Sequence, residues 1–228
     1  MRLRKAIMIA AAGVVVAGGL AVAPLTFAAE APGNACADVE IIGARASTER
    51  PGFGVLLGPL ARTLTQDLDV TVRSTAVDYP ATLGNYNNSV RQGVADMADK
   101  LEATAARCAD TRFVLMGYSQ GAQVTGDVLA GARGGRPAVP AAVSDRVAAV
   151  VLFGDPTFTA GESFNVAQGN RSGVFARGRG ELDAFADRTQ SFCNRNDRFC
   201  QSGNSLAAHL NYNGSLDEAA GFVASKVG

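Results

Sequence analysis

Tryptophan is absent from this chain of 228 residues, histidine occurs once, and neither sign of charge is in excess. The 21 basic and 21 acidic side chains balance, and no basic block follows the N-terminus, so we expect no nucleic-acid partner. One histidine and four cysteines, without zinc-finger spacing, argue against a structural zinc site. The composition therefore favours a function that needs neither a metal nor a basic surface.

A membrane-spanning run is also missing. Residues 7–20 form an uncharged apolar stretch after a basic start, but glycines interrupt it and it is shorter than the ~20 residues that a span requires. Small residues at 26–28 supply the positions that a signal peptidase reads. We predict that residues 1–28 are a secretion signal, cleaved at about residue 28 to 31. Residues 32–228 are then a single domain, secreted or associated with the cell envelope, and monomeric.

The four cysteines all follow the predicted signal, and an even number in an exported chain favours disulfides over metal thiolates. Four cysteines allow three pairings. Cys193 and Cys200 are close enough in the chain to close a local loop, which leaves Cys36 with Cys108. By restricting the unfolded chain, the long bridge would contribute about 4 kcal/mol and the short one about 2.5 kcal/mol.

Apolar runs of strand length alternate along the chain with helical patterns. The runs that we predict as strands are residues 39–44, 70–77, 113–117 and 148–153. They are apolar throughout rather than alternating, as in parallel strands covered on both faces. Residues 85–107 carry one apolar helical face, and 216–227 indicate a terminal helix opened by a capping box of Ser215 and Glu218. With a short fifth strand at 173–177, the pattern predicts an α/β layer sandwich.

The most informative segment is residues 113–121. An apolar run ends in Gly-Tyr-Ser-Gln-Gly, and residues 122–129 then indicate a helix. This context of strand, sharp turn and helix is the one in which Gly-x-Ser-x-Gly presents a nucleophile, here Ser119. Glycines at 117 and 121 fit because a side chain there would crowd the turn. The alternative is a glycine-rich turn whose serine only caps the helix.

A nucleophilic serine needs a general base within hydrogen-bond reach. His209 is the only histidine, so no other imidazole can fill that role. It follows Ser119 in the chain, which matches the Ser…acid…His order of α/β-hydrolases. The alternative is a surface or core histidine without a catalytic role.

A carboxylate between the serine and the histidine must then orient the imidazole. Asp197 lies inside the ring that a short disulfide would close, where it could be held against the histidine; the alternative is a solvated acid between two arginines. Asp155, which follows the fourth predicted strand, is the second choice. Asp127 lies on the helix after the serine and is poorly placed. The other acids in this interval are Asp145, Glu162, Glu181, Asp183 and Asp187.

The oxyanion formed during ester cleavage needs preorganised donors, commonly two backbone N–H groups. Gln120, the residue after the predicted nucleophile, would supply one of them. Ser47, in the loop after the first predicted strand, would supply the second. Alternatively, Ser47 or Thr48 could be the N-cap of a helix.

Together these segments resemble the cutinase family of secreted serine esterases, and within it the actinobacterial cutinase-like proteins. The similarity runs in family order from Cys36 to the terminal helix. Gly-Tyr-Ser-Gln-Gly combined with Cys-Asn-x-x-Asp-x-x-Cys is highly specific, whereas the glycine motif alone is not. The matching segments are residues 44–49, 79–84, 117–121, 151–154, 192–200 and 208–210.

The resemblance implies a three-layer α/β-hydrolase sandwich with a mainly parallel sheet of about five strands and no large lid domain. It implies Ser119 as the nucleophile, His209 as the base and Asp197 as the third member of the triad. It also implies an oxyanion hole formed by Ser47 and Gln120. The same two disulfides, and no metal or organic cofactor, are expected.

The resemblance further implies an acyl site open to solvent, for which Leu83, Leu206 and Leu210 are border candidates, although each could equally be ordinary core. We expect the substrate to be an ester with an apolar acyl chain, such as cutin-like polyester, lipid or a short- to medium-chain ester, with transient contact to a lipid or polymer surface. Ala46, where glycine is common, and the arginine-rich residues 171–179 depart from the fungal pattern. The alternatives are an acetylxylan esterase-type deacetylase, an envelope phospholipase or acyltransferase, and a non-catalytic lipid-binding surface protein.

Overall fold

Six strands form one parallel sheet, in the order β2-β1-β3-β4-β6-β5, in a computed structural model that describes residues 35–132 and 135–228. The predicted secretion signal, residues 1–28, lies outside the described residues, and the sheet belongs to the unit Cys36–Gly228. The mainly parallel sheet is confirmed, with six strands instead of about five. The strands are β1 (Val39–Ala44), β2 (Val72–Ala76), β3 (Arg112–Tyr118), β4 (Val147–Phe153), β5 (Asn165–Ala167) and β6 (Thr189–Cys193).

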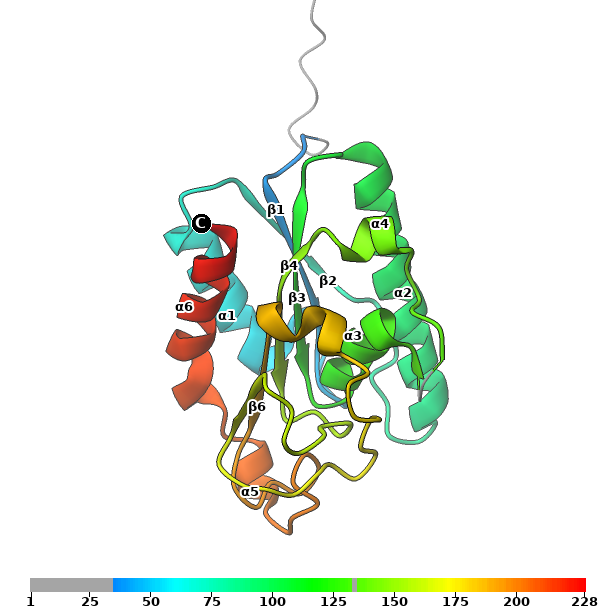
Figure 1. Cartoon of the computed structure of the whole chain (residues 1–228), viewed down its shortest axis with the longest axis vertical. Coiled ribbons are helices and arrows are strands. Elements are labelled where there is room, and N and C mark those ends of the chain that lie inside the picture. Colours follow the sequence, from blue (N-terminus) through cyan, green and yellow to red (C-terminus); the bar gives the residue numbers. More distant parts are fainter. Residues whose placement is uncertain (1–34, 133–134) are drawn as a thin grey trace, which may run out of the picture. The chain divides into compact units, whose positions relative to one another are not determined.

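Helices cover both faces of the sheet, so the predicted three-layer α/β sandwich is confirmed (Figure 1). α1 (Gly54–Asp67) and α6 (Leu216–Val227) pack on one face, and α2 (Tyr86–Arg107) and α3 (Gln120–Ala130) pack on the other. None of the helices in the described ranges has the length and hydropathy that a membrane crossing requires. The shorter helical segments are α4 (Ala141–Ser144), α5 (Leu206–His209) and the 3-10 turns η2 (Asp183–Arg188) and η3 (Asn213–Ser215).

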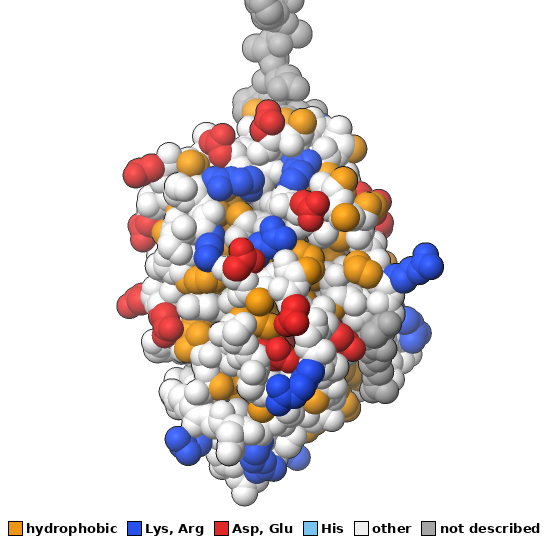
Figure 2. All heavy atoms as spheres, viewed as in Figure 1, with side chains coloured by type: hydrophobic (Ala, Val, Ile, Leu, Met, Phe, Trp, Pro, Cys, Tyr) orange, Lys and Arg blue, Asp and Glu red, His pale blue; other side chains and the backbone are white. Residues whose placement is uncertain are grey.

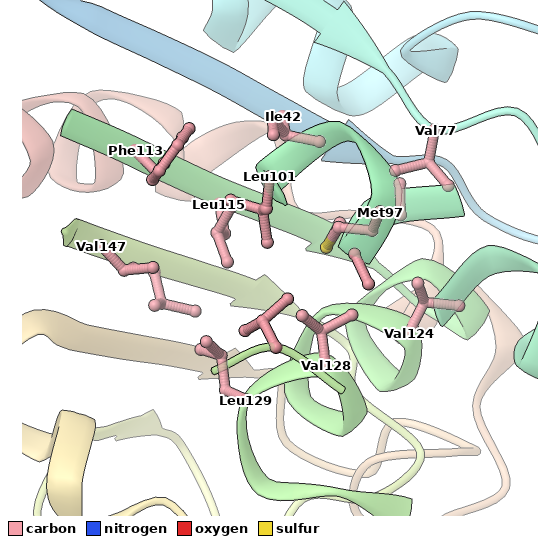
Figure 3. Close-up of a cluster of buried hydrophobic side chains, with 14 of the residues drawn as sticks. Ile42, Val77, Met97, Leu101, Phe113, Leu115, Val124, Val128, Leu129 and Val147 are labelled. Carbon is pink, nitrogen blue, oxygen red and sulfur yellow. The ribbon is translucent and has the colours of Figure 1, made fainter. Parts of the chain in front are cut away.

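Alternate residues of the central strands point to opposite faces of the sheet. Ile42 and Leu115 belong to the cluster under α2 and α3, and their neighbours Ile41 and Val114 belong to the cluster under α1 and α6. All four are fully buried, which explains why continuous apolar runs predict these strands. In Figure 3 the helical partners in the first cluster are Met97 and Leu101 of α2 and Val124, Val128 and Leu129 of α3.

Predicted and observed elements differ most at the two edges of the sheet. β1 and α6 have the predicted bounds, and β3 and β4 begin one residue earlier. β2 is shorter than the predicted 70–77 and carries Arg73, Ser74 and Thr75, so it is not apolar throughout; as an edge strand it is only partly covered. The predicted strand at 173–177 is wrong. The backbone N–H groups of Gly173, Phe175 and Arg177 donate to carbonyl oxygens of loop residues 156–158, and β5 and β6 extend the sheet instead.

The predicted capping box of α6 is also wrong. Ser215 precedes the helix, but its side chain makes no capping hydrogen bond. Its backbone is in the helical region (φ −101°, ψ 0°), because η3 leads directly into α6. A serine hydroxyl reaches the free N–H groups of a first turn from an extended backbone, so it cannot cap here.

All strands run in the same direction, so the loops that follow their carboxyl ends gather at one edge of the sheet. Three of these loops are residues 45–53 after β1, the turn at Ser119 after β3 and residues 194–205 after β6. The C-terminus lies at the opposite edge, because Arg112, the first residue of β3, donates hydrogen bonds to the carbonyl oxygens of Lys226 and Val227.

Two disulfides join the cysteines: Cys36 with Cys108 and Cys193 with Cys200. The first ties the segment before β1 to the segment before β3, and the second closes the loop after β6. Disulfides of this kind fit an extracellular protein. Acidic and basic side chains are interspersed over most of the face shown in Figure 2, in line with a formal net charge of zero.

Candidate active site

Ser119 lies in a sharp turn between β3 and α3, with φ 55° and ψ −118°. A Cβ at Gly121 would lie 1.9 Å from the carbonyl oxygen of Ala44 in β1, and one at Gly117 would lie 2.5 Å from Cα of Ala122. Both positions therefore require glycine. The serine side chain makes no capping hydrogen bond to the helix, so the alternative of a simple cap is wrong.

The side chains of Ser119, His209 and Asp197 form one chain of hydrogen bonds. Nε2 of His209 lies 3.0 Å from Oγ of Ser119, and Nδ1 lies 2.8 Å from Oδ2 of Asp197. The histidine comes from α5 and the aspartate from the loop after β6. His209 is 4% exposed and Asp197 is fully buried, so the bond between them is shielded from water. The arrangement can move a proton from a serine hydroxyl to an imidazole.

Three donors besides the imidazole hold the carboxylate of Asp197. The backbone N–H groups of Phe199 and Cys200 donate to Oδ1 at 2.7 and 3.0 Å, and the hydroxyl of Tyr212 donates to Oδ2 at 2.7 Å. Burial alone would raise the pKa of Asp197, but its hydrogen bonds and the neighbouring His209 outweigh burial and hold this pKa below its usual value. The carboxylate is therefore ionised inside the protein.

The competing acids are engaged elsewhere. Oδ1 of Asp155 accepts hydrogen bonds from the N–H and the hydroxyl of Thr157, and Asp127 forms a buried ion pair with Arg177 at 2.6 Å. Burial raises the pKa of both carboxyls, and Arg177 opposes that rise. Neither acid is the partner of the imidazole. Asp197 also is not a solvated loop acid, because it is fully buried.

The loop after β1 and the start of α3 present two backbone N–H groups, those of Ser47 and Gln120. Among the described residues, neither N–H takes part in a hydrogen bond. The side chain of Gln120 is turned away, since it accepts from Ser89 and donates to Thr82. α1 begins only at Gly54, so the alternative in which Ser47 or Thr48 caps a helix is wrong.

A cavity of about 830 Å³, here called the catalytic pocket, opens over Ser119 and His209. Six large hydrophobic side chains are exposed among the described residues, by 43 to 78%, and all six line this pocket. The predicted border residues are three of them. Such a concentration of exposed apolar surface marks a binding surface rather than ordinary core. The six are Val55, Leu83, Val174, Phe175, Leu206 and Leu210.

Several residues around the imidazole were not predicted. Phe199 packs edge-on against His209 at 4.5 Å between ring centroids, and the hydroxyl of Tyr118 donates to the carbonyl oxygen of His209. Gly154 faces the ring from the end of β4, where a Cβ would lie 2.9 Å from Cε1 of His209. Tyr212 keeps its proton because burial and the charge of Asp197 raise its pKa. Its place three residues after the histidine was the one available signal.

The cutinase family model matches residues 35–227, which is most of the chain. The chain belongs to the cutinase family. It is therefore a carboxylic ester hydrolase, and the family and the enzyme class predicted from the sequence are confirmed.

The proteins that this chain is similar to are named for different ester-hydrolysing activities. The chain is 38% identical over 200 residues to a cutinase of Kineococcus radiotolerans, a match that covers 84% of this chain and 62% of that protein. It is 34% identical over 208 residues to phospholipase Culp4 of Mycobacterium tuberculosis, covering 89% of this chain and 85% of that protein. The catalytic core of acetyl xylan esterase from Trichoderma reesei has a TM-score of 0.79 at 29% identity, covering 84% of this chain and 100% of that one.

Proposed function

We propose that this cutinase-family enzyme is a secreted serine esterase in which Ser119 is the nucleophile, His209 the general base and Asp197 the residue that orients the imidazole. The observation that carries the proposal is the continuous chain of hydrogen bonds from Ser119 through His209 to Asp197 beneath an apolar pocket. The free N–H groups of Ser47 and Gln120, unpaired among the described residues, support their role as the oxyanion hole.

The reaction proceeds through an acyl-enzyme. Oγ of Ser119 adds to the ester carbonyl carbon while its proton passes to Nε2 of His209. The tetrahedral intermediate collapses, Nε2 returns the proton to the departing alcohol, and the acyl group stays on the serine. Water then adds to the acyl carbon with loss of a proton to Nε2. Collapse releases the carboxylic acid and restores the hydroxyl of Ser119.

The substrate of the proposed reaction is an ester with an apolar acyl chain. The six exposed hydrophobic side chains around the pocket support transient contact with a lipid or polymer surface, since such contact would remove them from water. One chain supplies every residue of the proposed machinery, which supports action as a monomer. The two disulfides support secretion.

Replacement of the nucleophile tests the mechanism. Ser119→Ala should lower kcat for p-nitrophenyl butyrate by roughly 10⁶-fold, because the other triad residues have no nucleophile to activate. The thermal unfolding midpoint should stay close to wild type. A fluorophosphonate should label the wild-type enzyme at Ser119 and leave the variant unlabelled. Retained hydrolysis by the folded variant would contradict the assignment.

A carbohydrate deacetylase is the second candidate, favoured by the similarity to the acetyl xylan esterase core. The exposed apolar rim favours longer acyl chains instead. A series of p-nitrophenyl esters from acetate to octanoate separates the two. We expect kcat/KM to rise from acetate to butyrate or beyond; a maximum at acetate would favour the deacetylase.

A further inference from the structure

A second cavity, of about 320 Å³, lies beside the catalytic pocket. Phe175 lines both cavities, and no other described residue does so. The volume is at the lower end of the roughly 300–1,000 Å³ found for small-molecule sites. Phe175 therefore lies at the border between the two cavities.

Phe175 and Tyr86 form the partition between the two cavities. Their ring centroids are 5.6 Å apart and the rings are tilted by 50°. Tyr86 lines the catalytic pocket, and its hydroxyl donates to Oε1 of Gln123, which lines the second cavity. The side chain of Tyr86 is thus held by its backbone in α2 at one end and by its hydroxyl at the other. The backbone N–H of Phe175 donates to the carbonyl oxygen of Pro156, and its side chain, which packs against Tyr86, is 43% exposed.

Six of the nine residues that line the second cavity carry hydrogen-bonding side chains, although most of its exposed wall is apolar. Arg177, 7% exposed, donates to Asp127 and Thr157, but its Nε has no hydrogen-bond partner among the described residues. A buried donor of this kind is costly unless an oxygen atom satisfies it. The residues with hydrogen-bonding side chains are Asn87, Arg91, Gln123, Asp127, Thr157 and Arg177.

The second cavity is close to the nucleophile. Gln123 is one helical turn beyond Ser119, and its backbone N–H donates to the carbonyl oxygen of that serine at 3.2 Å. An ester bound at Ser119 with its acyl chain on the apolar rim has its alcohol portion free to point elsewhere. The donors and acceptors of the second cavity match an alcohol portion that carries further hydroxyl groups.

We propose that the second cavity binds the polyhydroxylated alcohol portion of an ester, of about the size of glycerol, and that Phe175 controls its admission. The proposal rests on the serine esterase function proposed above. A polyol has both C–H and O–H groups, and its oxygens can accept from Arg177 and Asn87 while its hydroxyls donate to Asp127. Phe175 is in this view a specificity-determining residue, and the acyl chain does not reach the second cavity.

Two butyrate esters with different alcohols test the proposal. Glycerol monobutyrate carries the polyol, and ethyl butyrate carries none. Asn87→Leu alters only the second cavity, and should raise KM for glycerol monobutyrate about fivefold, as expected for one lost hydrogen bond. Its kinetics with ethyl butyrate should match wild type. An unchanged KM for both esters would overturn the proposal.

Removing the partition gives the second arm of the experiment. Phe175→Ala should raise the ratio of kcat/KM for glycerol monobutyrate over ethyl butyrate about fivefold, since the polyol then enters without displacing the ring. Val174→Ala is the matched control, because Val174 lines the catalytic pocket and not the second cavity. Equal ratios in the two variants would overturn the proposal.

The same assays separate this proposal from the function on which it rests. If the Ser119→Ala variant no longer hydrolyses ethyl butyrate, the serine esterase function is established, whatever the results with glycerol monobutyrate. If that hydrolysis persists in Ser119→Ala, the proposed function fails. If it disappears but Asn87→Leu and Phe175→Ala leave the preference between the two esters unchanged, only the role of the second cavity fails.

Discussion

At the scale of single residues, Asp197 shows how a carboxylate can be kept ionised inside a protein. Two backbone N–H groups, a tyrosine hydroxyl and an imidazole surround its two oxygens. The ring closed by Cys193 and Cys200 supplies the two backbone donors. This carboxylate therefore has a fixed place relative to His209, which a solvated acid on an open loop would lack.

Asp197→Asn should lower kcat by about 10³- to 10⁴-fold, because the amide cannot hold the imidazole in the tautomer that accepts the serine proton. The assay is hydrolysis of p-nitrophenyl butyrate at saturating substrate. A variant with wild-type kcat would show that another acid serves His209, and Asp155→Asn is the comparison that would reveal it.

The same substitution has a signature in acid stability. The pKa of Asp197 is lower in the folded protein than its ordinary value of 3.8, so the stability it contributes is present above that value and is lost as the pH falls through the folded pKa. Urea midpoints should thus fall less steeply in Asp197→Asn than in wild type as the pH drops below about 4. Parallel curves would contradict the lowered pKa.

Sequence reasoning reached the main site residues for different reasons. His209 was chosen as the base because it is the only histidine, and Ser119 as the nucleophile because of the glycines around it. Asp197 was preferred to Asp155 because it lies inside the ring that Cys193 and Cys200 would close. Tyr212 was missed, since its place three residues after the histidine does not by itself indicate a hydroxyl that supports a carboxylate.

At the scale of elements, strands buried on both faces were predicted closely and edge segments less well. All six residues of β1 are buried, and Glu40 is the one charged residue in an otherwise apolar run. β6 has three polar residues before two apolar ones and lies beside a three-residue edge strand, β5; neither strand was predicted. α1 was also not predicted. Pro59 lies inside it, although its buried leucines recur at helical spacing.

Two glycines in helices give a matched test of the packing around the elbow. Gly121→Ala should destabilise the fold by about 3 kcal/mol or more, because its Cβ would overlap the backbone of β1. Gly221→Ala, in α6, should stabilise by up to about 1 kcal/mol, since nothing lies within 4 Å of the added methyl. Guanidinium unfolding midpoints measure both, and equal midpoints would show that the elbow tolerates a side chain.

At the scale of the whole molecule, the two disulfides lie at opposite ends of the parallel strands. Cys36–Cys108 lies where β1 and β3 begin, and the proposed nucleophile Ser119 follows the other end of β3. Cys193–Cys200 lies where β6 ends and encloses Asp197. Stability and activity should therefore depend differently on the two bridges.

Cys36→Ser with Cys108→Ser should cost about 4 kcal/mol of unfolding free energy and leave kcat near wild type, measured at a temperature where the variant is folded. Cys193→Ser with Cys200→Ser should cost about 2.5 kcal/mol but lower kcat on the order of 10²-fold, because the aspartate loop loosens. The reverse pattern, with activity lost only in the first pair, would contradict this division.

The bonds from Arg112 to the end of α6 also bear on how the enzyme could be attached to a solid support. Of the three lysines in the chain, Lys226 lies at this end of α6 and Lys100 lies on α2, and neither lines the catalytic pocket. A bond to Lys226 or Lys100, or a tether fused after Gly228, would thus hold the protein by groups that do not line the catalytic pocket. The rim would stay free to meet an insoluble polymer, without any redesign of the surface.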